Sequence, residues 1–152
     1  MTLGPSFAFI LDRDLARLGD QIQSYPDEGS LWIVAGTTKN SAGTLALHLV
    51  GNLEHFIGSV LGGTGYVRDR EAEFGDRDVP REEIMRRIAA CRTTMTDTLG
   101  AMDDDAILAP YPQESPLGLG EKTSHTFLLH LTAHFSWHLG QIDYHRRIVG
   151  GG

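Results

Sequence analysis

Histidine is the residue type in this sequence with the clearest capacity for chemistry. Four of the seven histidines lie near the C-terminus, at His130, His134, His138 and His145. His134 and His138 are four residues apart, so on a helix their Cβ atoms lie on one side, roughly 5–6 Å from each other. Both rings can then reach one cation, at about 2.0–2.1 Å from each nitrogen. The spacing predicts a divalent metal site.

A third ligand should come from another segment, because two protein ligands seldom hold a metal ion tightly. An earlier apolar segment offers His48 and His55. Glu54 beside His55 indicates a position near water, whereas His48 is flanked by Leu45, Leu47 and Leu49. We therefore predict that the metal ligands are His48, His134 and His138.

Other polar side chains are candidates for supporting roles. Asn52 and Gln141 each lie about one turn from a predicted ligand, and we expect them to orient a ligand or to contact a substrate. Arg70 is a further candidate for a contact with the substrate. It belongs to the charged segment 68–78, which we expect to be either a lid or a solvated loop.

The remaining C-terminal histidines have weaker claims. His130 lies one turn before His134 and is either a fourth ligand or, as we favour, a half-exposed supporting residue. We expect His125 and His145 to lie at the surface. A protonated ring at His145 would suit the negative end of the helix dipole.

Four helical segments are expected to position these residues, because apolar residues recur in them at spacings of three and four. The helices are expected at residues 6–25, 41–61, 78–100 and 123–149, with a buried connector at 31–34 and loops at 68–78 and 102–122. The second segment is apolar all round, which indicates burial on more than one side. We predict a single all-α domain over residues 1–152, an antiparallel four-helix bundle with long loops that allow a crossover connection.

The composition narrows the class of protein. Hydrophobic residues make up 41% and charged residues 22% of the chain, which is typical of a globular domain. The net charge of −7, without clusters of Lys and Arg, argues against binding to nucleic acid. Because no run of about 18 apolar residues suggests a membrane span, we expect a cytoplasmic protein. Cys91 is the single cysteine, so no internal disulfide is expected.

Several common catalytic motifs are absent from the sequence. The run Gly62-Gly63-Thr64-Gly65 lacks the Lys-Ser/Thr ending of a phosphate-binding loop. No G-x-S-x-G element presents a nucleophilic serine. Phe135 follows His134 where the H-E-x-x-H signature of zinc proteases has glutamate. A general base would therefore have to come from outside this motif.

The segments around the predicted ligands resemble a known family. His48-Leu-Val-Gly-Asn52-Leu-Glu-His55-Phe and His134-Phe-Ser-Trp-His138-Leu-Gly-Gln141-Ile142-Asp-Tyr144 are similar to the DinB-like superfamily, the damage-inducible, YfiT-type bundle proteins. Arg70-Glu71-Ala-Glu73-Phe74 resembles one uncharacterised bacterial branch of it. The resemblance implies an antiparallel four-helix bundle, commonly a homodimer, with nickel or zinc bound by three histidines that map onto His48, His134 and His138.

The same resemblance suggests classes of reaction. Some members of the superfamily are metal-dependent thiol transferases that act with bacillithiol, mycothiol or glutathione, and one is an isomerase that uses mycothiol. We expect a dimeric metalloenzyme that acts on a small molecule, by thiol transfer with a low-molecular-weight thiol or by metal-assisted hydrolysis. Two alternatives remain open: a bundle that keeps the metal for structure or sensing, and a dimeric interaction module. Metal binding is expected to weaken below about pH 6 as imidazoles protonate.

Overall fold

The computed structural model describes residues 2–114 and 122–150, and these residues form an all-helical structure. The long helices are α1 (Leu3–Gln23), α2 (Ala42–Leu53), α4 (Arg81–Gly100) and α6 (Ser124–Gly150). The shorter elements are the 3-10 helix η1 (Gly29–Trp32), the π-helix η2 (Glu54–Ser59), and helices α3 (Arg70–Gly75) and α5 (Asp104–Leu108). No strand occurs in the described ranges, so the predicted all-α class is confirmed.

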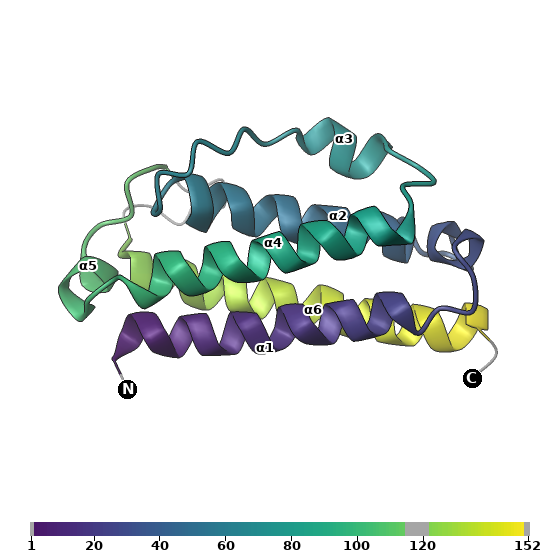
Figure 1. Ribbon diagram of the computed structural model, residues 1–152, viewed down its shortest axis with the longest axis horizontal. Coiled ribbons are helices and arrows are strands. Elements are labelled where there is room, and N and C mark those ends of the chain that lie inside the picture. Colours follow the sequence, from purple (N-terminus) through teal and green to yellow (C-terminus); the bar gives the residue numbers. More distant parts are fainter. Residues whose placement is uncertain (1, 115–121, 151–152) are drawn as a thin grey trace.

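The four long helices lie side by side, but their directions do not simply alternate (Figure 1). α1 and α6 run one way, whereas α2 and α4 run the other way. Hydrogen bonds join Asp12 to Arg92 across the antiparallel pair α1 and α4, and Gln21 to Asp143 across the parallel pair α1 and α6. α2 likewise packs between α6, to which it is antiparallel, and α4, to which it is parallel. The antiparallel arrangement expected from the sequence thus describes two of these four neighbouring pairs.

A long connection between α2 and α4 makes the parallel pairs possible. Residues 60–80 leave one end of α2, return along the outside of the helices and enter α4 at the opposite end (Figure 1). This connection carries α3, which packs against α2. All 12 residues of α2 are buried as a result, as its apolar character on several sides predicted.

The core consists of apolar helix faces with the predicted spacing. Residues three and four apart on α1 are completely buried, namely Leu11, Leu15, Leu18 and Ile22. Facing positions on α4 and α6 are also buried, among them Ile84, Ile88, Phe127, Leu131 and Phe135. Each such side chain stabilises the fold by about 1.5–3 kcal/mol relative to exposure. Within the described part of the chain, no helix combines the length and the apolar character needed to cross a membrane.

Three segments differ from the prediction. The expected loop 68–78 contains α3, and the expected loop 102–122 contains α5, although its residues 115–121 lie outside the described part. In both cases an aspartate caps a short helix: Asp69 accepts a hydrogen bond from the Ala72 amide, and Asp103 accepts one from the Ala106 amide. The expected buried connector 31–34 lies partly in η1, and only its first residue, Leu31, is buried, whereas Trp32 is half-buried and residues 33–34 are exposed.

Candidate metal centre

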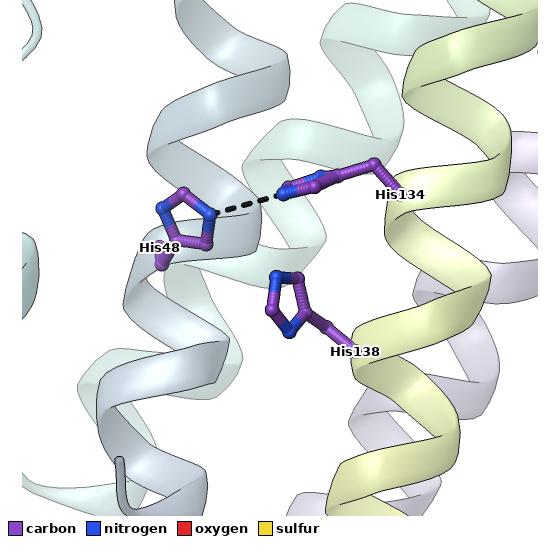
Figure 2. A group of neighbouring side chains, drawn as sticks. All are labelled: His48, His134 and His138. Carbon is purple, nitrogen blue, oxygen red and sulfur yellow. Dashed lines mark hydrogen bonds between the residues drawn. The ribbon is translucent and has the colours of Figure 1, made fainter. Parts of the chain in front are cut away.

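Three histidines from two helices converge on one point (Figure 2). His48 lies on α2, and His134 and His138 lie on successive turns of α6. One nitrogen from each ring lies within 4.8 Å of the others, close enough for all three to hold a metal ion. The three rings are nearly perpendicular to one another, with interplanar angles of 81–88°. The structure therefore brings together the three histidines chosen from the sequence.

The spacing of the ring nitrogens fits a metal ion. His48 Nε2 and His134 Nε2 are 3.2 Å apart. Two ligands of one tetrahedral ion, each about 2.0–2.1 Å from it, are separated by about 3.3 Å. In the metal-free protein the same separation suits a hydrogen bond between the two rings. These histidines thus need little movement to act as ligands together.

Glu73 on α3 fixes the orientation of the His48 ring. Its Oε1 lies 3.1 Å from His48 Nδ1, and because an ionised carboxylate only accepts, Nδ1–H donates. The lone pair of the neutral ring is then on Nε2, which faces the other histidines (Figure 2). Such a carboxylate behind a histidine ligand sets the tautomer and makes the ligand more basic.

Arg68 keeps the Glu73 carboxylate ionised. The guanidinium donates two hydrogen bonds to it, Nε to Oε2 at 2.7 Å and Nη2 to Oε1 at 2.8 Å. Burial alone would raise the pKa of Glu73, but the hydrogen bonds from Arg68 and His48 lower it below its usual value. Sequence reasoning missed Glu73 and Arg68, because a contact between residues 48 and 73 depends on the crossover connection.

Gly51 makes room for the Glu73 carboxylate on the surface of α2. A Cβ added at Gly51 would overlap with the Glu73 carboxylate oxygen Oε2 and its carbon. We therefore expect Gly51→Ala to displace Glu73 and to weaken metal binding by about tenfold, at the lower end of the cost of losing a group behind a ligand. Calorimetric titration with zinc measures this. Gly140→Ala on α6 is the control, because a Cβ there meets nothing within 4 Å. Unchanged affinity in Gly51→Ala would contradict the role assigned to this glycine.

Gln141 plays the same part for His138, as the sequence suggested. Its Oε1 lies 2.7 Å from His138 Nδ1, and because this oxygen only accepts, Nδ1–H donates. Nε2 of His138 is left with its lone pair toward the other two rings (Figure 2). His134 lacks such a partner within the described residues, since its Nδ1 is buried without a hydrogen bond.

Burial favours the neutral form of the two α6 histidines. It is the main cause that lowers the pKa of His134 to about 4, with further contributions from the neighbouring His138 and His48 rings. Burial also lowers the pKa of His138, against the opposing hydrogen bond to Gln141. A neutral imidazole is the form that binds metal, so these rings are ready for a cation at neutral pH.

The lowered pKa of His134 predicts a loss of stability in acid for the metal-free protein. A histidine in the unfolded chain has a pKa near 6.5, so between about pH 6.5 and pH 4 the unfolded state takes up a proton that the folded state excludes. The free energy of unfolding therefore falls as the pH drops through this window. Urea unfolding at pH 7.5 and pH 5 measures the loss, which should be smaller in His134→Asn. Equal losses in both proteins would contradict this account.

The other candidate ligands, His55 and His130, lie outside the three-histidine group. His55 is half-buried beside Phe56 and stands outside the group of three. The π-helix η2 begins at Glu54, so His55 no longer follows the period that placed it near His48 on a regular helix. His130 is half-buried, with its ring 6.1 Å from that of His134, and it also stands outside the group.

The prediction for His145 was wrong. Its side chain is buried, with Nδ1 2.7 Å from the Tyr25 hydroxyl and Nε2 2.7 Å from the Ile33 carbonyl oxygen. The Ile33 carbonyl accepts from Nε2–H, and the Tyr25 hydroxyl pairs with Nδ1 and also lies 3.2 Å from the Ile142 carbonyl oxygen, to which it can donate. His145 thus ties α6 to the segments that follow α1 and η1. His125 is half-buried, with its ring 5.8 Å from that of Phe7, so it is only partly exposed.

A cavity of about 600 Å³ opens beside the three histidines. Besides the three histidines, its polar lining comes from Asn40, Asn52, His130, Arg68 and Arg70. Its apolar lining comes from Leu45, Phe56, Phe74, Phe127 and Leu131. A second cavity of about 390 Å³ also borders His138 and reaches Gln141. The candidate centre therefore has space next to it for a small organic molecule.

Two of the residues predicted to contact a substrate line this cavity. Asn52 is buried at the cavity wall, and its side chain makes no hydrogen bond to another described residue. Arg70 is exposed at the cavity rim, with its guanidinium 4.9 Å above the Phe74 ring. The Phe74 ring in turn packs on His48 at 4.8 Å.

Comparisons with models of known protein families, with curated proteins and with solved structures gave no match. The class of protein is therefore defined by its all-helical fold and by three histidines close enough to bind a metal ion.

Proposed function

We propose that the protein binds one divalent metal ion, nickel or zinc, through His48, His134 and His138, and that it is a metal-dependent enzyme of the DinB-like superfamily. The observation that carries the proposal is the orientation of the rings. Glu73 and Gln141 accept hydrogen bonds from the Nδ1 atoms of His48 and His138, which directs both Nε2 lone pairs to the point that His134 Nε2 also faces. Imidazole nitrogen is a preferred ligand of both ions.

The chemistry supplied by such an ion is the activation of a bound water or thiol, whose pKa it lowers toward neutrality. The protein residues would hold and orient the ligands, and Asn52 could donate to a substrate in the cavity. The described residues that line this cavity include no carboxylate. This favours thiol transfer over hydrolysis, because a thiolate attacks without a general base.

The test of this function begins with the metal. Protein expressed without an affinity tag should contain about one nickel or zinc ion per chain by elemental analysis. The metal-loaded protein is then assayed with a panel of low-molecular-weight thiols and small electrophiles, and with a panel of esters. Turnover in the thiol panel that disappears after chelation would support the proposal. Absence of stoichiometric metal would refute it.

A non-catalytic metal-binding bundle is the second candidate, and the lack of a carboxylate base in the cavity lining also supports it. The same panels distinguish the two functions. If the metal-loaded protein turns over neither panel, the centre has a role in structure or sensing.

A homodimer is part of the proposal, supported by apolar side chains exposed along one side of α6. These residues recur at helical spacings of eight, seven and four, at Leu129, Trp137, Tyr144 and Ile148. Large exposed apolar surfaces of this kind are typical of interfaces. Light scattering should give twice the mass of the chain for the wild type and a single chain for Trp137→Glu. A monomeric wild type would remove this part of the proposal.

A further inference from the structure

Arg70 has an unusual position among the arginines of the described residues. Every other arginine there donates a hydrogen bond to a carboxylate or to a backbone carbonyl. Arg70 has no such partner there, and its recorded contact is the face of the Phe74 ring at 4.9 Å. Its donors are therefore free to bind a ligand.

The cavity that Arg70 borders is positive in an otherwise acidic protein. The chain has a net charge of −7, yet the described lining of the cavity contains Arg68 and Arg70 and no Asp or Glu. Arg68 is already paired with Glu73 through two hydrogen bonds. Arg70 is thus the lining cation whose charge is not compensated, and a divalent ion on three neutral histidines would add to it.

We infer that the substrate of this centre is a small organic anion with an apolar body, and that Arg70 determines this specificity by pairing with the anionic group. The planar guanidinium binds an anion such as a carboxylate through two parallel hydrogen bonds. The aromatic and aliphatic side chains of the cavity, Leu45, Phe56, Phe127 and Leu131, provide the surface for the apolar body. The inference rests on the proposed metal-binding function, and the experiment below separates the two.

The connection between Arg70 and the centre runs through one aromatic ring. Phe74 packs under the Arg70 guanidinium on one side and against the His48 ring, at 4.8 Å, on another. The stacking restricts the arginine to the rim of the cavity without using its hydrogen-bond donors. An anion bound there would lie in the same cavity as the open side of the three-histidine group.

A matched pair of thiols tests the inference on cobalt-loaded protein. β-Mercaptopropionate and its alcohol analogue, γ-mercaptopropanol, both offer a thiolate to the metal, but only the first carries a carboxylate. Thiolate binding is followed through the sulfur-to-cobalt absorption band. In the wild type the carboxylate form should bind about tenfold more tightly, the effect of one hydrogen-bonded ion pair.

The variants show whether Arg70 is responsible. Arg70→Gln should bind the two thiols with equal affinity, and Arg70→Lys should keep part of the preference. Arg86→Gln on α4 removes the same charge away from the cavity and should behave as the wild type. Equal affinities in the wild type would overturn the inference. A preference that persists in Arg70→Gln would also overturn it, because the carboxylate would then be bound by the metal itself.

Failure of the metal site looks different from failure of the inference. A wild type that gives no cobalt spectrum refutes the proposed function. The anion site is then decided on the metal-free protein by NMR titration with phenylpropionate and with its neutral alcohol. Shifts of amide signals in α3 with phenylpropionate that vanish in Arg70→Gln would support the anion site, and no response in the wild type would refute it.

Discussion

Replacing His134 by alanine is expected to lower the affinity for zinc or nickel by more than about a hundredfold. Loss of a ligand should exceed the roughly 10–100-fold cost of losing a group that supports a ligand. His134 Nε2 lies 3.2 Å from His48 Nε2 and within 4.8 Å of the His138 nitrogen of the group, so the variant removes one of the three converging nitrogens. Calorimetric titration gives the affinity. The metal content after dialysis, measured by elemental analysis, should fall from about one ion per chain to a trace.

His130→Ala is the matched control for this variant. His130 is half-buried one turn earlier on α6 and lines the same cavity, but it stands outside the group of three. The variant should keep a full metal complement. A loss as large as that in His134→Ala would make His130 a ligand, and normal metal content in His134→Ala would remove the site assignment. His145→Ala is not a suitable control, because it removes a buried side chain and both of its hydrogen bonds.

Replacing Glu73 by glutamine is expected to lower metal affinity by about 10–100-fold although Glu73 is not a ligand. The amide retains the shape of the side chain but loses the charge that holds His48 Nδ1–H and compensates Arg68. An uncompensated guanidinium beside the centre also repels a cation. The change leaves half-buried Arg68 with weaker hydrogen-bond acceptors, and we expect the metal-free protein to lose about 1–3 kcal/mol of stability.

The control for Glu73→Gln lies two residues away on the same short helix. Glu71 is exposed on α3, so Glu71→Gln changes the net charge equally without touching His48. Zinc titration and urea unfolding of both variants give the comparison. An equal loss of affinity in the two variants, relative to the wild type, would show that the charge near the site matters and the hydrogen bond to His48 does not.

The sequence predicted the long helices and the three histidines for the same physical reason. Both signals are local: apolar spacing of three and four marks a helix face, and His134 and His138 four residues apart must share one face. The choice of His48 over His55 depended on its leucine neighbours, which indicated burial. The structure agrees, since His48 is buried and His55 is not fully so.

What the sequence could not predict depends on contacts between distant segments. The six residues of α3 are too few to show a helical period. Nothing in the sequence therefore distinguished Glu73 and Arg68 from their charged neighbours. The direction of each long helix depends on the path of the connection 60–80 across the bundle. The length of this segment permits a crossover but does not determine its path. His145, next to two arginines, was predicted at the surface, yet Tyr25 and Ile33 cover it in the fold.

X-ray absorption spectroscopy of the metal-loaded protein tests the central proposal most directly. We predict three imidazole nitrogens at about 2.0–2.1 Å from a zinc ion, with a light atom or an added thiol completing the shell. In His48→Ala we expect either two imidazoles around the ion in place of three, or no bound metal at all. Fewer than three imidazoles around the ion in the wild type would contradict the account of the centre.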